Sequence, residues 1–270
     1  MATATAGTTT GNTAGTMSTD YRRTGLHEWH VRGILLLCCF SAVALLALTF
    51  PRIVSYAAIA PAAKVAAALD LGFPVAREDI VAAESAYTKA LAWSPRDARI
   101  LHDHARVARR LAYYAESRPE GAGQAPLESA DFYRQKAIQS LRDAAAAAPA
   151  NGTVWALLAR TELDRGAAPR DVTGLLNVAR LTAPSRASAL LLLHGISMRH
   201  WHEMPDETRN HALANTHLLW AKPDLRPVLI ESYLAGGLAA RSAFRSDMKL
   251  RPGGLEQFDR QLSTSLRRRR

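Results

Sequence analysis

An uninterrupted apolar run near the amino terminus constrains this chain more than any other feature. Residues 33–50 carry no charged side chain. As a helix, a run of this length reaches about 27 Å, which is just enough to cross the hydrocarbon core of a bilayer. The alternative is a buried core helix, but such helices seldom lack a polar stripe along their whole length. The sequence therefore predicts a transmembrane helix over residues 33–50.

The same run argues against a cleaved signal sequence. It is longer than the roughly 7 to 15 apolar residues of a cleaved signal, and the nearest small-x-small site, Ser55-Tyr56-Ala57, follows Pro51. An uncleaved anchor is expected. The only two cysteines, Cys38 and Cys39, are adjacent and lie within the run. This placement excludes a disulfide framework and zinc-binding Cys-x-x-Cys spacing.

The flanks of the run give its expected surroundings. Residues 1–32 begin with a stretch of Thr, Ala, Gly and Ser, and we predict a disordered tail because such a segment buries little apolar surface. Arg22, Arg23 and Arg32 precede the run, whereas only Arg52 and Lys64 follow it closely. By the positive-inside rule the amino terminus lies in the cytoplasm. We therefore expect a single-pass protein of the bacterial inner membrane with most of the chain in the periplasm.

Residues 51–240 carry a degenerate helical repeat. Alanine fills 51 of the 270 positions, which favours helix over strand. Four helix-prone segments end at prolines 95, 149, 184 and 223, and the tetratricopeptide repeat, a helical hairpin of about 34 residues, has a proline at this point. Small residues let the next helix approach closely, and large ones fill the gap between helices. The predicted packing residues are Ala83, Tyr87, Ala90, Pro95, Ala137, Leu141, Ala144, Pro149, Trp155, Leu158, Ala159, Leu176, Ala179 and Pro184.

The repeat has two irregularities. The first interval contains extra residues, and the polar Gly/Pro-rich stretch 116–124 is the expected loop insertion. Before Pro223 the expected packing positions fall on His211, Asn215 and Leu218, which do not fit the pattern. The overall expectation is an all-α protein in which one transmembrane helix precedes a tetratricopeptide-like solenoid of helical hairpins. Cations and acids nearly balance over 51–240, so we expect no strong charge in its groove.

The last segment, residues 241–270, is basic. Leu255, Phe258, Leu262 and Leu266 recur at helical spacing, and the predicted cap helix is followed by a tail of four arginines, Arg267, Arg268, Arg269 and Arg270. Two interpretations stay open. The helix and tail could bind anionic lipid, or the helix could close the end of the solenoid beneath a solvated tail.

The sequence gives little indication of catalysis. Five histidines fall within 194–217, but their spacing does not match ligands on one helix face, and Pro205 would break the helix of a His-Glu-x-x-His motif. Phosphate-binding glycine loops and nucleophile elbows are absent from the sequence. We therefore expect no enzyme activity, no metal, no cofactor and no nucleic-acid partner, and a protein that acts by protein–protein contacts.

The order of motifs from Trp155 to Gly237 resembles a family of membrane-anchored, tetratricopeptide-like bacterial proteins. They are encoded with exopolysaccharide or O-antigen polymerisation and export genes. The matching segments are, in order, Ala148-Pro149, Trp155–Arg160, Leu175–Pro184, Arg199-His200-Trp201, Asp206–Arg209 and Leu219-Trp220-Ala221. The resemblance implies a scaffold or accessory role in envelope polysaccharide assembly or export, within an inner-membrane complex. The alternatives are a periplasmic assembly chaperone of the cytochrome c maturation type, which would use the histidine-rich segment, and a general envelope scaffold.

Overall fold

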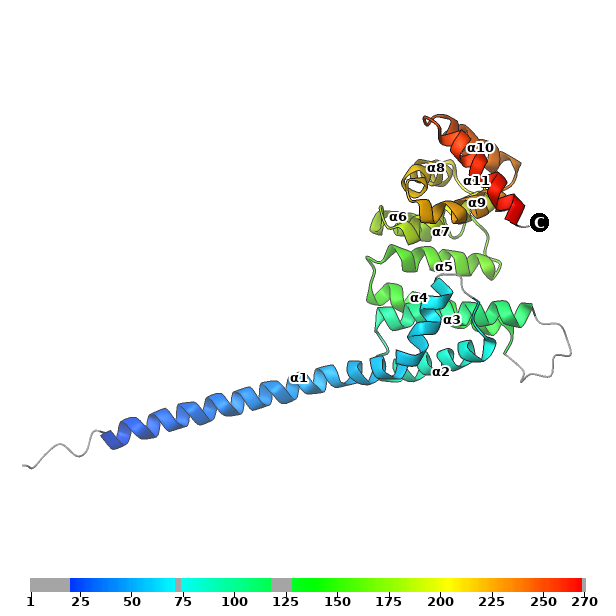
Figure 1. Ribbon diagram of the computed structural model, residues 1–270. Coiled ribbons are helices and arrows are strands. Elements are labelled where there is room, and N and C mark those ends of the chain that lie inside the picture. Colours follow the sequence, from blue (N-terminus) through cyan, green and yellow to red (C-terminus); the bar gives the residue numbers. More distant parts are fainter. Residues whose placement is uncertain (1–19, 71–73, 118–127, 269–270) are drawn as a thin grey trace, which may run out of the picture. The chain divides into compact units, whose positions relative to one another are not determined.

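The computed structural model describes residues 20–70, 74–117 and 128–268, and these ranges are helical throughout with short connections and no strand (Figure 1). The chain divides into two compact units, Met1–Ile53 and Val54–Arg270. The all-helical class expected from the alanine content is confirmed. The predicted disorder of residues 1–19 lies outside the described residues.

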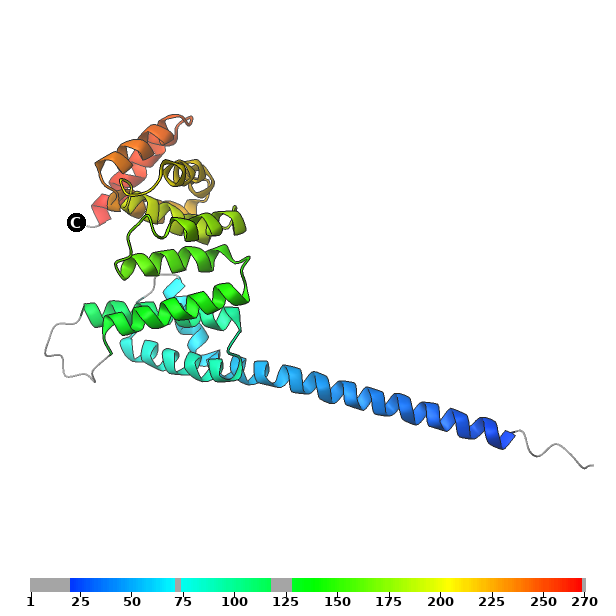
Figure 2. The ribbon, with the colours of Figure 1, turned by 180° about the vertical axis from the view of Figure 1, so that it is seen from behind.

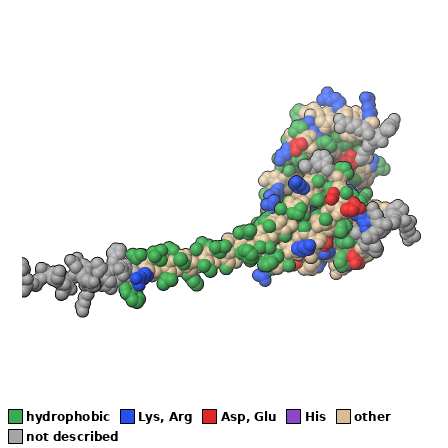
Figure 3. Space-filling view, turned by 60° about the horizontal axis from the view of Figure 1, so that its bottom comes forward, with side chains coloured by type: hydrophobic (Ala, Val, Ile, Leu, Met, Phe, Trp, Pro, Cys, Tyr) green, Lys and Arg blue, Asp and Glu red, His purple; other side chains and the backbone are tan. Residues whose placement is uncertain are grey.

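One long helix, α1 (Asp20–Asp70), contains the predicted span. Its stretch Val31–Leu69 is long and apolar enough to cross a membrane. The large apolar side chains from Val31 to Ile53 are exposed, and Figure 3 shows them along the helix.

The helix differs from its expected boundaries at both ends. Residues 20–32, expected in the irregular tail, are helical, and the helix continues past Pro51 and Pro61. A proline inside a helix removes one hydrogen bond. The alanine-rich stretch after Pro51 compensates, because alanine has the highest helix propensity and Ile59, Ala62 and Ala66 are buried.

The second unit is a stack of shorter helices. Consecutive helices pack side by side, α5 also contacts α7, and Figures 1 and 2 show α2 to α8 in successive layers. The elements are α2 (Arg77–Trp93), α3 (Ala98–Glu116), α4 (Ala130–Ala147), α5 (Gly152–Asp164), α6 (Thr173–Thr182), α7 (Ala187–Arg199), α8 (Asp206–Trp220), η1 (Pro223–Leu225), α9 (Arg226–Ala235), α10 (Leu238–Lys249) and α11 (Gly254–Arg268). The expected insertion at 116–124 falls largely on residues 118–127, outside the described residues.

Three turns between these helices share one backbone geometry. The residue before the proline, which is Ser94, Ala148 or Ala183, has φ between −134° and −143° and ψ between 58° and 72°. Its N–H donates to the carbonyl of an alanine four residues earlier. The proline then prevents the helix from continuing, because it has no N–H and clashes with the preceding turn. The sequence repeat thus corresponds to a repeated turn in the structure.

The predicted packing residues occupy distinct environments. The three prolines are exposed, and Trp155 is partly buried with its Nε1 donating to the Pro149 carbonyl at 2.8 Å. The buried ones lie in the interior between the helices. They are Ala83, Tyr87, Ala90, Ala137, Leu141, Ala144, Leu158, Ala159, Leu176 and Ala179.

The last repeat is shifted by one residue. Helix α8 buries Ala212, Thr216 and Leu219, each one position after the residue expected from Pro223. The reason is the connection: α8 ends at Trp220, and both Ala221 and Lys222 precede the proline. In the three earlier turns a single residue separates helix and proline. The repeat therefore persists through α8 with a longer turn.

The C-terminal region forms more structure than the single cap helix expected from residue 241. Helix α10 begins at Leu238 and contributes the buried Phe244 and Met248. Phe258 of α11 lies 5.1 Å from Phe244, 4.9 Å from Tyr233 and 5.8 Å from Trp220, measured between ring centroids. Leu255 and Leu262 of α11 pack against the same cluster.

The apolar face of α11 is therefore used inside the protein. Leu266 stays 44% exposed at its end, and Arg267 is exposed. The expected lipid contacts of Arg268, Arg269 and Arg270 lie outside the described side chains.

Candidate binding groove

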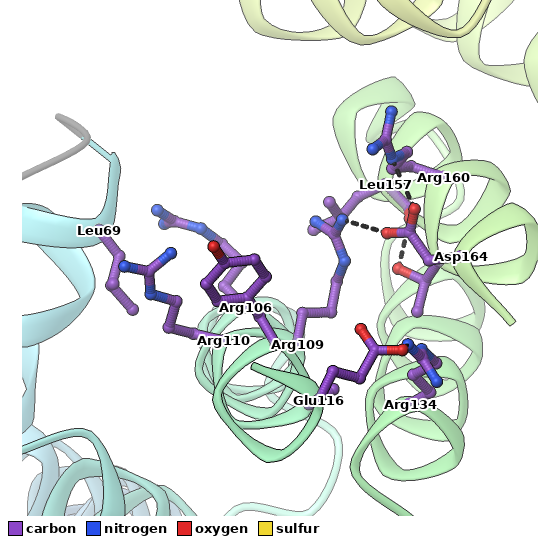
Figure 4. Close-up of a pocket in the computed structure, with 12 residues that line it drawn as sticks. Leu69, Arg106, Arg109, Arg110, Glu116, Arg134, Leu157, Arg160 and Asp164 are labelled. Carbon is purple, nitrogen blue, oxygen red and sulfur yellow. Dashed lines mark hydrogen bonds and ion pairs between the residues drawn. The ribbon is translucent and has the colours of Figure 1, made fainter. Parts of the chain in front are cut away.

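A basic groove lies in the second unit between the end of α1 and helices α3, α4 and α5 (Figure 4). Its volume is about 590 Å³. Two acids, Glu116 and Asp164, lie among its described lining residues together with apolar side chains and Tyr113. The same lining contains five arginines, namely Arg106, Arg109, Arg110, Arg134 and Arg160.

Helix α3 contributes most of the groove. Asp97 caps its start, because its side chain accepts hydrogen bonds from the N–H groups of Arg99 and Ile100 at 3.0 and 3.2 Å. Arg106, Arg109 and Arg110 recur three and four residues apart, which places them on one side of the helix. Val107 and Ala108, which lie between them in the sequence, are buried.

Asp164 of α5 forms ion pairs with two arginines of the groove lining, Arg109 and Arg160. Arg109 Nη2 donates to Asp164 Oδ2 at 2.8 Å, and Arg160 Nε lies 2.9 Å from Asp164 Oδ1. Burial lowers the pKa of Arg109; Asp164 acts in the opposite direction, and Arg160 and Arg106 lower that pKa further. One carboxylate therefore holds two guanidiniums that repel each other.

Two further arginines have their own partners. Arg134 of α4 forms an ion pair and hydrogen bond with Glu116 of α3. Arg106 Nη1 lies 3.5 Å from Asp103 Oδ1, and its Nη2 donates to the Ala66 carbonyl of α1 at 3.2 Å. These contacts fix the walls of the groove to each other.

Arg110 is held by aromatic rings. Its guanidinium lies 5.1 Å from the ring centroid of Tyr113 and 5.0 Å from that of Tyr114. Tyr114 is fixed in turn, since its hydroxyl donates to the Val75 carbonyl at 2.9 Å. Within the described part of the chain, Arg110 has no acidic partner, and its Nε is buried without an acceptor. Tyr113 is 55% exposed, so this part of the groove is open.

The pKa of Arg199, at the end of α7, is lowered first by partial burial and then by the positive charge of Arg160, whereas Asp164 raises it. Arg199 does not line the groove.

We expected a groove without strong charge, but the described lining has more arginines than acids. Near-balance over residues 51–240 is an average, and folding gathers arginines from three helices on one side while many acids lie elsewhere. The spacing of Arg106, Arg109 and Arg110 was the one available signal. None of the predicted packing residues lines the groove; the buried ones lie in the core between the helices.

The histidine-rich segment forms no ligand cluster. His194 is fully buried against Phe244, with ring centroids 5.7 Å apart, and burial lowers its pKa to about 4. His200 and His211 lie on the surface, 3.6 Å from Glu203 and Glu207 respectively. Among the residues described by the structure, no group of three His, Cys, Asp or Glu side chains could hold a metal ion.

A second polar cluster joins α2, α3 and α4. His104 Nδ1 lies 2.9 Å from Ser140 Oγ, and His104 Nε2 lies 3.6 Å from Glu84 Oε1. The order Ser–His–Glu matches a hydrolase triad. Ser140 is only 6% exposed and does not line the groove. Because Lys136 also binds Glu84, the cluster is best understood as a buried tie between helices.

No family model matches this sequence, and no curated protein matches it either. The fold and the groove still define a class of molecule: a helical protein with one helix able to cross a membrane and a basic groove in its second unit. Its function is inferred from these features.

Proposed function

We propose that this chain is a membrane-anchored, tetratricopeptide-like adaptor whose groove binds a partner protein. The observation that carries the proposal is the groove of about 590 Å³ formed by α1, α3, α4 and α5. Helical repeats commonly use such concave surfaces to bind peptides and proteins. The three similar proline turns, and the buried alanines in the helices that end at them, support a solenoid of this kind.

The anchor in this proposal is α1. Its exposed apolar stretch supports a single pass through the bacterial inner membrane. The arginines before the stretch support a cytoplasmic amino terminus and a periplasmic second unit. A reporter that works only outside the cytoplasm should be active when it is fused after Arg270. If a reporter that works only in the cytoplasm is active at this position instead, the second unit is cytoplasmic and the proposed orientation is wrong.

The proposed setting is envelope polysaccharide assembly or export. Support comes from the resemblance between residues 155–237 and the anchored repeat proteins encoded with exopolysaccharide and O-antigen genes. The partner in this proposal is a component of the inner-membrane polymerase or export complex. The protein acts on it by contact and not by catalysis.

Site-specific photocrosslinking in the membrane tests the proposal. A photoreactive residue replaces Tyr113, which lines the groove, or Leu181, which is 69% exposed on α6 outside it. We expect position 113 to capture a polysaccharide-complex protein and position 181 to capture much less of it. Absence of any captured protein at position 113 would contradict the adaptor function, and capture of haem-attachment proteins would favour the cytochrome c maturation alternative.

A further inference from the structure

We infer that the groove receives an acidic peptide segment of the partner, whose carboxylates pair with the arginines of α3 and α5. The inference rests on the proposed function, because it specifies the chemistry of the partner at the same groove. It follows from the balance of charge, the placement of the arginines and the apolar part of the lining.

The charges of the groove are unequal. Five arginines and two acids lie among the described lining residues, and Asp164 is already shared by Arg109 and Arg160. Glu116 is engaged by Arg134. Arg110 contacts two tyrosine rings and, within the described ranges, no acid. A carboxylate entering from solvent would supply the missing negative charge.

Each arginine makes it less favourable for its neighbours to carry their positive charge. Arg160 and Arg106 both disfavour the charged form of Arg109, and Arg160 has the same effect on Arg199. Like charges held this close in a partly buried site repel each other strongly. An anionic ligand reduces that repulsion, and this reduction contributes to its binding free energy.

The arginines recur with the helical layers. Arg106 and Arg160 stand at the same distance along the chain from Pro95 and Pro149, and Arg110 and Arg199 stand at the same distance from Pro95 and Pro184. Arg106 and Arg160 therefore bring equivalent positions of α3 and α5 to one groove. An extended peptide rises about 3.3 Å per residue, so acids at every third residue stand about 10 Å apart along it.

The remaining lining favours a peptide over a purely polar polyanion. Leu69, Ala112 and Leu157 give the groove an apolar part beside the exposed ring of Tyr113. A peptide can place apolar side chains there between its carboxylates. Guanidinium groups bind carboxylates through paired hydrogen bonds, which adds geometric specificity to the charge.

The test uses the full chain in micelles of a neutral detergent and a fluorescent Glu-Leu-Ser repeat peptide. We expect saturable binding that weakens with added salt. The matching Gln-Leu-Ser and Lys-Leu-Ser peptides should bind at least about tenfold more weakly, a difference of about 1.4 kcal/mol. Equal binding of the Gln and Glu peptides would overturn the inference.

Two variants separate groove chemistry from net charge. Arg110→Gln removes the groove arginine without an acidic partner, and Arg170→Gln removes one whose side chain is 84% exposed before α6. We expect the Kd for the Glu peptide to rise about tenfold in Arg110→Gln and less than about twofold in Arg170→Gln. Equal weakening by both variants would overturn the inference, as would preferred binding of an oligouronate with the same dependence on Arg110.

Crosslinking from position 113 distinguishes a failure of this inference from a failure of the proposed function. Capture of a partner that is lost with Arg110→Gln supports both. Capture that persists unchanged with Arg110→Gln leaves the adaptor function standing and overturns the acidic-peptide inference. Binding of the Glu peptide with no captured protein contradicts the adaptor function alone.

Discussion

Arg109 Nη2 donates a hydrogen bond to Asp164 Oδ2 at 2.8 Å and so joins α3 to α5 across 55 residues of sequence. Because the same carboxylate also contacts Arg160, its removal would leave two arginines without their shared acid. This contact therefore influences both the stability of the helical stack and the charge of the groove.

Asp164→Asn should lower stability and strengthen binding of acidic peptides. The Arg109 and Asp164 side chains are 26% and 32% exposed, so we expect a loss of about 1–3 kcal/mol in the free energy of unfolding. Denaturant unfolding followed by circular dichroism measures it. The control Asp171→Asn alters an exposed pair at 3.8 Å and should cost less than about 0.5 kcal/mol.

Glu84 should stabilise the protein in a defined range of pH. Its pKa is lowered from 4.5 to about 2, first by His104 and then by Lys136, although burial raises it. Because the folded-state pKa is below the unfolded value, the stabilisation is complete above pH 4.5 and is lost as pH falls towards 2. Glu84→Gln should cost about 3 kcal/mol at pH 7 and little near pH 2, at about 1.4 kcal/mol per pKa unit. An equal cost at both pH values would refute this assignment.

Buried His194 should also make the stability of the folded protein decrease at acidic pH. Burial lowers its pKa from 6.5 to about 4, so the folded protein keeps the ring neutral while the unfolded chain takes up a proton. Stability is therefore unaffected above pH 6.5 and falls by about 3 kcal/mol as pH decreases to 4. His194→Phe, which keeps a ring beside Phe244, should remove this decrease in unfolding experiments between pH 7 and pH 4. If the variant and the parent lose equal stability, another group is responsible.

Gly152 should tolerate no side chain. A Cβ at this position would lie 2.4 Å from the Ala179 carbonyl oxygen and 2.5 Å from Ala183 Cβ, because the start of α5 packs directly on the end of α6. Gly152→Ala should lower the free energy of unfolding by about 1–3 kcal/mol. In Gly174→Ala the new Cβ meets nothing within 4 Å, and stability should stay level or rise by up to about 1 kcal/mol. Equal melting temperatures of the two variants would contradict the close approach.

The helical stack could be predicted from sequence where one signal recurred. Pro95, Pro149 and Pro184 end their helices with the same geometry, so positions counted back from each proline fell on the buried face. At Pro223 the count was wrong by one residue because the turn is longer there. The end of α1 was missed because Pro51 predicts a break, whereas burial of Ile59 and Ala62 maintains the helix.

The groove could be predicted only in part. The spacing of Arg106, Arg109 and Arg110 shows that they share one face of a helix, and this holds for any isolated helix. Arg160 joins them because α4 packs against both α3 and α5, and because Asp164 of α5 pairs with Arg109 of α3. The cluster therefore results from tertiary packing, and total charge gives no indication of it.

The additional residue before Pro223 marks the end of the repeated turn geometry. Lys222 precedes this proline with φ −97° and ψ 109°, whereas Ser94, Ala148 and Ala183 share a different geometry before theirs. The chain instead folds α9, α10 and α11 around Phe244 and Phe258. Of these helices, α9 and α10 pack on α7 and α8, so the stack ends in an aromatic cluster that also contains Tyr233 and Trp220.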